Sequence, residues 1–340
     1  MKIFVTGGSG FLGSNFIRYA LSRGYKICNF DALTYAASLG NLDDVSAHPN
    51  YFFLKGDVRD KTFVEEAIFS EQPTAIVHFA AESHVDRSIE GPSAFLETNI
   101  IGTFNLLEAA RKYWNYILMD PAFRFHHIST DEVFGSLATP ALFSERSAYA
   151  PNSPYAASKA ASDHLVRSWN KTYNLPTSLS NCSNNFGPYQ FPEKFIPKVI
   201  TRALKKISIP IYGDGENIRD WIFVDDHSIA VVDILEKGKA GASYNIGGGN
   251  ERTNIGVASA ICELLDAKRP DFAPHNTLLK YVKDRPGHDF RYAVDSTKIK
   301  NELGWFAKTP FDLGLEKTVN WFTDNQEWWM KLVSTVKSND

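Results

Sequence analysis

The chain has 340 residues, 44% of them hydrophobic, and a net charge of −3. This length predicts one large α/β core with a smaller lobe, and the near-neutral charge gives no electrostatic case for nucleic acid or membrane partners. No apolar run approaches the roughly 20 residues that span a bilayer. The three cysteines, Cys28, Cys182 and Cys262, are too scattered for a disulfide framework or a metal site. We therefore expect a cytoplasmic protein.

Strands and helices alternate through the first half of the chain. Apolar periodicity predicts strands at Lys2–Thr6, Lys26–Asp31, Tyr51–Lys55, Ala75–Phe79, Phe125–Ser129 and Thr177–Asn181, and helices at Phe11–Leu21, Asp60–Glu71, Ser93–Tyr113 and Tyr155–Tyr173. Such alternation predicts an α/β fold, a Rossmann-type doubly wound parallel sheet with right-handed crossovers. After about residue 185, prolines and glycine turns break the alternation. We therefore expect a Rossmann domain at 1–185, completed by strand and helix additions from later residues, and a smaller C-terminal substrate-binding lobe at 186–340.

A glycine-rich loop joins the first predicted strand to the first predicted helix. Gly7, Gly10 and Gly13 let the backbone turn tightly and approach a pyrophosphate at the helix N-terminus. Asp31 ends the second strand, 18 residues after Gly13. A carboxylate there accepts hydrogen bonds from ribose hydroxyls and repels a 2′-phosphate, which favours NAD over NADP as the cofactor. Asp57 is expected near the adenine.

Tyr155 and Lys159 lie one helical turn apart, so they share a helix face. The ammonium is expected to lower the pKa of the phenol, which can then take a hydroxyl proton as a hydride leaves. Tyr-x-x-x-Lys often occurs by chance, so the pair gains weight only from its context. Pro154 places the tyrosine in the first turn of its helix. The pair predicts a dehydrogenase step.

Thr130, Asp131 and Glu132 follow the fifth predicted strand. An acidic pair at a strand end is as often a helix cap or a solvated loop as a site. The functional interpretation is that two close carboxyl groups separate in pKa, which gives an acid and a base at one pH. That combination is what eliminating water from an oxidised intermediate needs.

Two arginines beside turns in the second half, Arg219 and Arg285, suggest a second nucleotide. Arginine is the planar, multi-donor residue that suits a diphosphate. Each arginine alone is more often part of a surface ion pair. Together they indicate that the substrate is a nucleotide derivative.

Several longer stretches carry a resemblance to a known family. They are the segments 31–36 (DALTYA), 80–88 (AAESHVDRS), 130–135 (TDEVFG), 182–189 (CSNNFGPY) and 284–289 (DRPGHD). With the glycine loop and Tyr-x-x-x-Lys, the chain resembles the extended short-chain dehydrogenase/reductases that modify nucleotide sugars. More specifically, it is similar to the dTDP-glucose 4,6-dehydratase family over nearly its whole length. The resemblance implies an NAD-dependent hydro-lyase of deoxysugar biosynthesis, with rhamnose as one destination of the product.

The family's mechanism implies a role for each catalytic position. Tyr155, supported by Lys159, would deprotonate the C4 hydroxyl while hydride passes to NAD+, and Thr130 would hydrogen-bond that oxygen. Glu132 would then remove the C5 proton, and Asp131 would protonate the departing C6 hydroxyl. Hydride return to C6 would give a 4-keto-6-deoxy sugar.

The motifs and the resemblance together assign two further sets of residues. The expected cofactor contacts are Gly7, Gly10, Phe11, Leu12, Gly13, Asp31, Ala32, Leu33, Thr34, Asp57, Val58, Phe79, Ala80, Ala81, Ser83, Thr98, Asn99, Tyr155, Lys159 and Asn185. The expected substrate contacts are Ser83, Asp86, Thr130, Asn184, Glu193, Lys194, Phe195, Pro210, Tyr212, Arg219, Asn254, Arg285 and His288.

Departures from the family pattern leave the donor open. Phe134 and Phe186 replace the usual Tyr, Ala37 replaces Gly, and Phe195 replaces Leu. The nucleobase and the C2 substituent are therefore unsettled between dTDP-glucose and a UDP-sugar (UDP-glucose or UDP-N-acetylglucosamine).

Two other functions compete with the dehydratase. A nucleotide-sugar 4-epimerase would share the fold and cofactor but has no use for the Asp131–Glu132 pair. A non-catalytic NAD-sensing protein would be expected to have lost the tyrosine, the lysine or the acidic pair. Finally, the helices at 93–113 and 155–173 are expected to pair with a second copy as a four-helix bundle, as in the superfamily, which predicts a homodimer.

Overall fold

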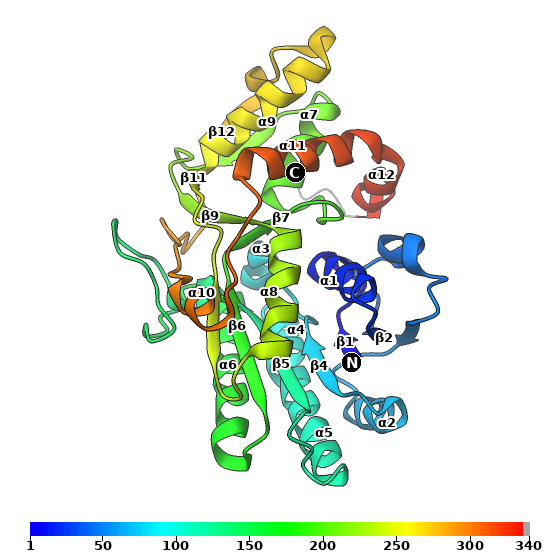
Figure 1. Cartoon of the computed structure of the whole chain (residues 1–340). Helices are drawn as coiled ribbons and strands as arrows, with labels where there is room; N and C mark the ends of the chain where they lie inside the picture. Colours follow the sequence, from blue (N-terminus) through cyan, green and yellow to red (C-terminus); the bar gives the residue numbers. More distant parts are fainter. Residues whose placement is uncertain (336–340) are drawn as a thin grey trace.

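A seven-stranded sheet forms the centre of the molecule (Figure 1). The computed structural model describes residues 1–335. The strands run in the order β10-β6-β5-β4-β1-β2-β3, and all six pairings are parallel. Their bounds are β1 Lys2–Thr6, β2 Lys26–Asp31, β3 Tyr51–Lys55, β4 Ala75–His78, β5 Arg124–Thr130, β6 Thr177–Cys182 and β10 Ser243–Ile246. The predicted Rossmann-type doubly wound sheet is confirmed.

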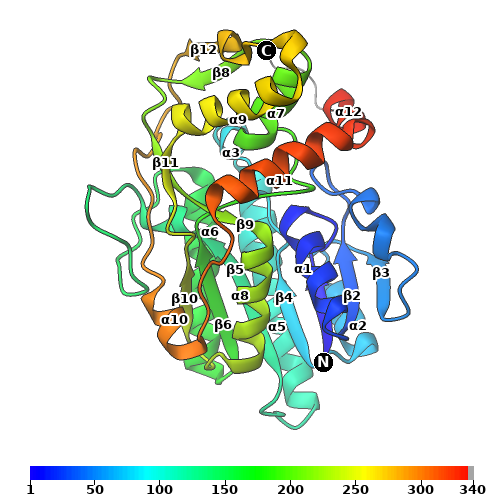
Figure 2. The same ribbon diagram turned by 45° about the horizontal axis from the view of Figure 1, so that its top comes forward.

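Helices cover both faces of this sheet. Helices α1 and α8 lie side by side on one face (Figure 2), and α2, α5 and α6 pack together on the other. The elements of the first half, with α8, are α1 Phe11–Ser22, η1 Leu39–Val45, α2 Lys61–Glu71, α3 Val85–Glu90, α4 Ser93–Phe95, η2 Leu96–Ile101, α5 Gly102–Tyr116, η3 Asp131–Phe134, α6 Pro154–Tyr173 and α8 Val224–Lys237. Helix α6 begins at Pro154 because the Ser153 hydroxyl caps the Ala156 amide and the proline suits the first helical position.

The helix predicted at Ser93–Tyr113 differs from the one observed. A π-helical segment, η2, separates α4 from α5, and α5 continues to Tyr116. At this point the Asn99 carbonyl accepts hydrogen bonds from the hydroxyls of Thr103, at 2.6 Å, and Ser162, at 2.5 Å. Ser162 comes from α6, so a tertiary contact accompanies the change of helical pitch, and the local sequence does not reveal it.

A smaller lobe follows β6 in the chain and lies beyond the carboxyl edge of the large sheet (Figure 1). It holds a three-stranded sheet, β11-β9-β7, and a two-stranded sheet, β12-β8. The remaining elements are β7 Asn184–Phe186, α7 Phe195–Leu204, β8 Ile209–Tyr212, β9 Ile218–Phe223, β11 Glu251–Thr253, α9 Asn254–Lys268, η4 Pro270–Phe272, η5 His275–Leu278, β12 Leu279–Val282, α10 Thr297–Leu303, α11 Phe311–Asp324 and α12 Gln326–Thr335. Two segments of this half of the chain return to the large sheet: α8 packs on α1, and β10 pairs with β6.

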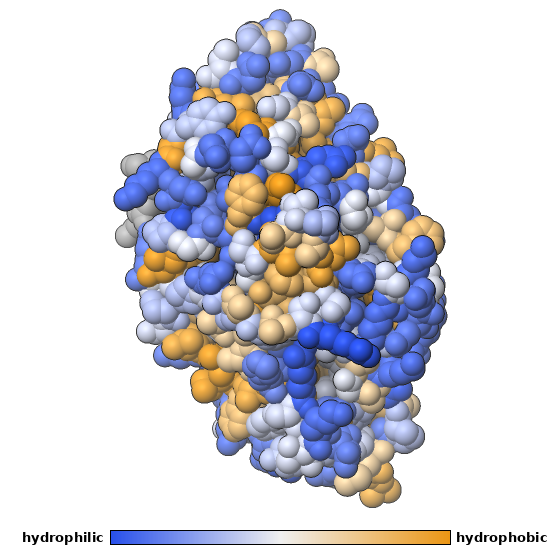
Figure 3. Space-filling model, turned by 90° about the vertical axis from the view of Figure 1, so that its left-hand side faces the viewer, coloured by the Kyte–Doolittle hydropathy of each residue, from blue (hydrophilic) through white to orange (hydrophobic). Residues whose placement is uncertain are grey.

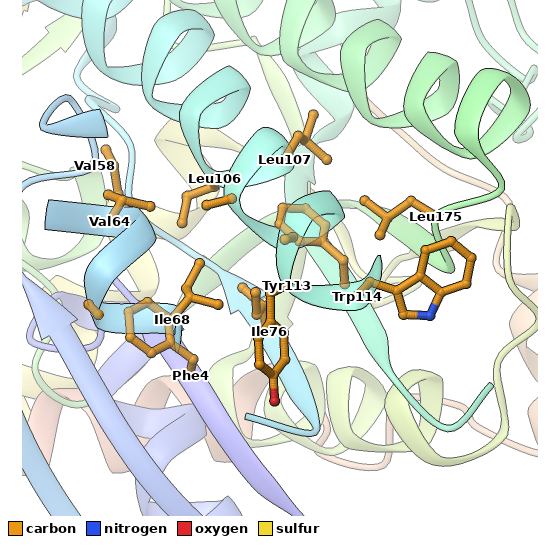
Figure 4. Packing of buried hydrophobic residues seen from close by; sticks show 14 of the residues in the cluster. Phe4, Val58, Val64, Ile68, Ile76, Leu106, Leu107, Tyr113, Trp114 and Leu175 are labelled. Carbon is orange, nitrogen blue, oxygen red and sulfur yellow. The ribbon is translucent and has the colours of Figure 1, made fainter. Parts of the chain in front are cut away.

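Alternating side chains of the central strands are buried on both faces, as a fully covered parallel sheet requires. Phe4 of β1 packs toward α2 and α5 with Ile76, Ile68 and Leu106 (Figure 4). Its neighbours Ile3 and Val5 belong to the cluster beneath α1 and α8. A third cluster fills the smaller lobe. Because a fully buried Phe, Leu or Ile stabilises the fold by roughly 1.5–3 kcal/mol, these clusters contribute much of the stability of the two lobes.

Outside these cores the surface is mixed. The face shown in Figure 3 carries hydrophilic side chains interspersed with smaller apolar areas, as is usual for globular proteins. Among residues 1–335, no helix combines the length and the apolar character needed to cross a bilayer.

Candidate active site

The carboxyl ends of the central strands open into a cavity of about 340 Å³. Its walls come from the glycine loop, the ends of β2, β4, β5 and β6, the start of α6, and the segment that leads into α7. Ligands of open parallel sheets bind at this edge. All five predicted catalytic residues, Thr130, Asp131, Glu132, Tyr155 and Lys159, line this cavity.

The glycine loop forms a tight cradle at one end of the cavity. Gly7 has φ +70°, and a Cβ atom on it would lie 2.6 Å from the Ala80 nitrogen. A Cβ atom on Gly13 would lie 2.3 Å from the Gly7 carbonyl oxygen. Helix α1 begins here with no side-chain cap and no acidic residue in its first turn. Its free amide groups and positive dipole therefore suit a phosphate group.

Asp31 is fixed beside this loop. Its carboxylate accepts hydrogen bonds from the backbone amides of Ser9, at 2.9 Å, and Leu33, at 2.7 Å. Burial raises the pKa of Asp31, and the two amides oppose that shift. The carboxylate lines the cavity in a fixed orientation, as a ribose contact requires.

Two asparagines at the start of β7 complete this part of the cavity. The side-chain oxygens of Asn184 and Asn185 are buried and have no hydrogen-bond partner among the described residues. Both residues line the cavity. Buried polar atoms are normally paired, so these two oxygens fit a site that a polar ligand completes.

Tyr155 and Lys159 lie almost fully buried on α6, with exposed fractions of 8% and 3%. The Lys159 ammonium donates a hydrogen bond to the Ile128 carbonyl at 2.8 Å and lies 3.3 Å from His127 Nε2. Burial lowers the pKa of Lys159 to about 8. The prediction that Lys159 lowers the pKa of Tyr155 is wrong for this structure. Burial, with Glu132 nearby, raises it well above the ordinary value, so Tyr155 binds its proton strongly.

Thr130 ends β5 and turns the chain into η3. Its hydroxyl accepts a hydrogen bond from the Glu132 amide at 3.2 Å and donates one to Asp131 Oδ1 at 3.3 Å. Asp131 is 2% exposed, and its Oδ2 has no partner among the described residues. The threonine thus holds the Asp131 carboxyl group and the Glu132 backbone at the end of the strand.

The two carboxyl groups differ in their proton affinity. Burial raises the pKa of Asp131 well above its ordinary value, and the charges of Glu132 and Asp220 raise it further. Burial also raises the pKa of Glu132, but Lys194, Arg219 and Arg285 oppose that shift. Asp131 is therefore the group that keeps a proton, and Glu132 is the group that three cations favour as an anion. The family resemblance assigns the acid to Asp131 and the base to Glu132 in the same order, and this assignment stays a prediction.

A cationic cluster lies on the side of the smaller lobe. Lys194 lines the cavity and donates a hydrogen bond to the Ser83 carbonyl at 2.7 Å. Arg285 forms an ion pair with Asp86 at 2.5 Å, and the Tyr212 hydroxyl also contacts Asp86 at 3.5 Å. Arg219 is buried, and its guanidinium donates to the carbonyls of Ile218, Asp289 and Phe290.

Most but not all of the predicted binding residues reach the cavity. Of the cofactor set, Leu33 and Asn99 do not line it. Leu33 contributes only its amide to Asp31, and the Asn99 side chain bonds the Glu82 backbone and Ser158. Of the substrate set, the cavity is lined by Ser83, Thr130, Asn184 and Lys194. It is not lined by Asp86, Glu193, Phe195, Pro210, Tyr212, Arg219, Asn254, Arg285 and His288.

Other cavity residues were missing from the predicted sets. They are Phe30, Ala36, Ala37, Gly56, Arg59, Glu82, Ala94, Ile128, Ser129, Cys182, Ser183, Gln190 and Phe191. Most are immediate neighbours of predicted residues, so extending each motif by one or two positions would have found them. Arg59 also holds Asp57 through an ion pair at 2.6 Å.

Comparison with known proteins identifies the family to which the chain belongs. The family model described as GDP-mannose 4,6 dehydratase matches residues 4–318. The chain is 53% identical over 328 residues to the dTDP-glucose 4,6-dehydratase of Xanthomonas campestris pv. campestris (strain B100), covering 95% of this chain and 93% of that protein. The chain belongs to the dTDP-glucose 4,6-dehydratase family.

Solved structures of similar proteins include members of this family and epimerases. The dTDP-glucose 4,6-dehydratase of Streptomyces venezuelae, crystallised with NAD bound, is 43% identical, with a TM-score of 0.90 over 98% of this chain and 100% of that chain. The UDP-glucose 4-epimerase of Thermus thermophilus, in complex with NAD, is 30% identical, with a TM-score of 0.85 over 96% and 100% of the two chains. The fold is thus common to both activities, and the residues of the site must distinguish them.

The glycine cradle gives a first testable prediction. Gly13→Ala places a methyl group against the Gly7 carbonyl and should widen the loop, lowering the affinity for the dinucleotide at least about tenfold. Titration of the cofactor-free protein with NAD measures this affinity. Gly91→Ala is the matched control, because the nearest atom to its added Cβ lies 4.0 Å away. Equal affinities of Gly13→Ala and the unmodified protein would show that the cradle does not hold the dinucleotide.

Proposed function

We propose that this protein is an NAD-dependent nucleoside-diphosphate-glucose 4,6-dehydratase that converts dTDP-glucose to dTDP-4-keto-6-deoxyglucose. The observation that carries the proposal is the pair of buried Asp131 and half-buried Glu132, which line the same cavity as Tyr155 and differ in proton affinity. An oxidoreductase that only removes and returns a hydride needs no such pair. An enzyme that also eliminates water needs one acid and one base.

The cavity fits NAD at the end formed by β1 and β2. The glycine cradle would hold the pyrophosphate, Asp31 the adenosine ribose, and Asp57 the adenine. The nicotinamide, when bound, accepts a hydride from the sugar and later returns it. Ser83, Thr98 and Asn185 are proposed to position the remainder of the dinucleotide. NAD in the S. venezuelae and T. thermophilus structures supports this assignment.

Tyr155 is proposed to take the proton of the C4 hydroxyl. Burial raises the pKa of its phenol, so Tyr155 must first lose that proton to act as the base, and the buried Lys159 is the cation that stabilises the ionised form. The Thr130 hydroxyl would bond the same substrate oxygen. A ketone at C4 makes the C5 hydrogen acidic, so the oxidation prepares the sugar for the next step.

Glu132 and Asp131 are proposed to perform the elimination. Glu132 would remove the C5 proton, and Asp131 would give its proton to the departing C6 hydroxyl, so that one water molecule leaves. Hydride return to C6 and protonation at C5 complete the reaction. Because the hydride returns to the sugar, no net oxidation occurs and the cofactor is regenerated.

The diphosphate is assigned to the cations on the smaller lobe. Lys194, Arg219 and Arg285 all act electrostatically on Glu132, and of the three Lys194 lines the cavity. Arginine suits diphosphate oxygens because it offers several donors in one plane. Asn184, Tyr212, Asn254 and His288 are proposed as further substrate contacts.

The departures from the family pattern leave the sugar end of the cavity intact. Phe134 stacks on Phe143 at 5.0 Å, and Phe186 and Phe195 both pack against Trp221 in the smaller lobe. None of the three lines the cavity, whereas Ala37 does. The three phenylalanines therefore do not argue against dTDP-glucose as the donor. Two relatives are named dTDP-glucose 4,6-dehydratase, which favours dTDP-glucose over a UDP-sugar.

The second candidate is a nucleotide-sugar 4-epimerase, which the likeness to the T. thermophilus enzyme favours. An epimerase inverts C4 through the same oxidation and requires Tyr155 and Lys159 only. The burial of Asp131 beside a second carboxyl group would then have no function. For this reason the dehydratase is preferred.

Mass spectrometry of the purified protein with dTDP-glucose, UDP-glucose and UDP-N-acetylglucosamine, with no cofactor added, tests the proposed function. We expect dTDP-glucose to lose the mass of one water molecule and the other two donors to react more slowly. Loss of water from a UDP-sugar instead would change the donor. An unchanged mass together with a new 4-epimer in the NMR spectrum would identify the epimerase.

The acidic pair gives a second prediction. Asp131→Asn with Glu132→Gln keeps the size of both side chains but removes the proton donor and the base. We expect NAD binding and C4 oxidation, measured as NADH absorbance, to remain, while dehydration falls at least about 1,000-fold. The control is Glu65→Gln with Glu66→Gln, an adjacent acidic pair on α2. A double variant that still forms the 6-deoxy product at nearly the original rate would refute the assignment.

We also propose that the protein forms a homodimer. Helices α5 and α6 pack side by side, and their outward faces carry apolar residues. Phe104 contacts Trp169 edge-on at 5.9 Å, and Ile101 and Tyr173 are 50% and 43% exposed. Pairing this face with a second copy would form a four-helix bundle and bury these side chains.

The dimer gives a third prediction. Ile101→Glu should shift the mass measured by light scattering at micromolar concentration from dimer toward monomer, because a charge would be buried at the interface. Ile207→Glu is the matched control, since Ile207 is 42% exposed on the smaller lobe. A monomeric mass of the unmodified protein would contradict the bundle.

We also place the protein in the cytoplasm and in deoxysugar biosynthesis, of which rhamnose is one product. Its three cysteines are free and buried, as suits a reducing compartment.

A further inference from the structure

We propose that Asp163, acting through His127, is a positioning residue that keeps Lys159 charged and so sets the upper pH limit of the reaction. This inference rests on the proposed function, in which the ammonium of Lys159 stabilises ionised Tyr155. Neither Asp163 nor His127 lines the cavity. Both lie behind the lysine, between α6 and the central sheet.

Asp163 is a fully buried carboxylate held in one orientation. It follows Lys159 by four residues on α6, so both side chains lie on the helix face that packs on the sheet. Its Oδ2 atom accepts hydrogen bonds from the hydroxyls of Ser129, at 2.9 Å, and Tyr149, at 2.8 Å, and from the Asn181 amide at 3.1 Å. These donors on Oδ2 leave Oδ1 directed toward His127, at 3.3 Å from Nε2.

His127 connects the carboxylate to the lysine. Its Nε2 atom lies 3.3 Å from Asp163 Oδ1 and 3.3 Å from Lys159 Nζ. A neutral imidazole offers at Nε2 either a proton, which suits Asp163, or a lone pair, which suits Lys159. Nε2 therefore faces both charges but can pair with only one of them at a time. His127 is fully buried, and its other nitrogen has no partner among the described residues, so the ring has no competing contact.

The other ionisable groups that face Lys159 do not carry the required negative charge. His127 on β5 and His78 on β4 are neutral near pH 7, because burial lowers the pKa of His127 to about 4 and that of His78 well below its ordinary value. Burial raises the pKa of Cys182 on β6 to about 12, so its thiol keeps its proton. On α6 itself, burial likewise keeps the phenol of Tyr155 protonated.

Asp163 is therefore the anion that compensates the lysine. Burial would raise its pKa, but the nearby His127 imidazole and the charge of Lys159 outweigh that effect and lower it. In return, Asp163 is the main group that raises the pKa of Lys159 against the larger effect of burial. Without Asp163, the pKa of Lys159 would be lower than in the intact site, so the lysine would lose its proton at a lower pH.

The test is the pH profile of kcat/KM for dTDP-glucose between about pH 6 and 10, because this ratio reports the ionisation of the free enzyme. Removing the carboxylate lowers the pKa of Lys159, so an enzyme that needs the ammonium loses activity at a lower pH. For Asp163→Asn we expect the alkaline limb to move down by at least about one unit. Activity at about pH 9 should then fall about tenfold or more, while activity at about pH 6 changes little.

A merely structural role would give a different result. If Asp163 only anchors α6 to the sheet, Asp163→Asn would lose activity equally at every pH, with the alkaline limb unmoved, and this outcome would overturn the proposal. Asp226→Asn is the matched control. Asp226 is also buried and accepts a backbone hydrogen bond from Thr309, but it belongs to α8. Its profile should keep the position of the limb.

A second variant decides the matter even if Asp163→Asn does not fold. His127→Leu keeps the carboxylate but removes the nitrogen between the two charges, so its alkaline limb should move in the same direction by a smaller amount. An unmoved limb in His127→Leu would refute the connection through the imidazole. Failure of the unmodified enzyme to dehydrate dTDP-glucose would instead refute the proposed function, so the two failures are distinguishable.

Discussion

Burial of ionisable side chains at the carboxyl edge of the parallel sheet is the constraint on which the site depends. Asp131, Lys159 and Asp163 are each 3% exposed or less. In such surroundings the charged form of each group is costly, so a nearby opposite charge or hydrogen bond decides which form persists. Asp131 keeps its proton, whereas Asp163, with three donors and a cation, does not. Two aspartates on neighbouring elements thus acquire opposite roles.

The smaller lobe adds cations that act on Glu132. Arg219 is buried and Lys194 is half-buried, and both act on Glu132, whereas Arg285 is paired with Asp86 in a half-exposed ion pair. Exposed pairs of this kind contribute only about 0–1 kcal/mol. Breaking this pair would therefore cost little if Arg285 binds the diphosphate as proposed. The lobe explains how one sheet edge accommodates both a dinucleotide and a nucleotide sugar.

Local signals made most of the large sheet predictable from the sequence. The glycine cradle and Asp31 follow from a strand, a turn and a helix that are adjacent in the chain, and the structure places them as expected. The π-helical segment at Leu96–Ile101 was not predictable, because it accompanies a hydrogen bond from Ser162, which lies far along the chain on α6.

In the site, too, local motifs were predictable from the sequence and contacts between distant segments were not. Tyr155 and Asp131 were found because they stand in short motifs, and the family resemblance gave them roles. The raised pKa of Tyr155 was missed, because burial depends on how α6 packs on the sheet rather than on the spacing to Lys159. Asp163 gave no signal in the sequence, since its importance comes from His127 and Lys159 meeting it in space.

The fate of the hydride tests the central claim most directly. The protein would be incubated with dTDP-glucose that carries deuterium at C4, and the product analysed by NMR. The account predicts that the deuterium appears at C6 of a 4-keto-6-deoxy sugar, because the hydride leaves C4, is held in the cavity and returns to C6. Deuterium found at C4 of an inverted sugar, or lost to the solvent, would contradict it.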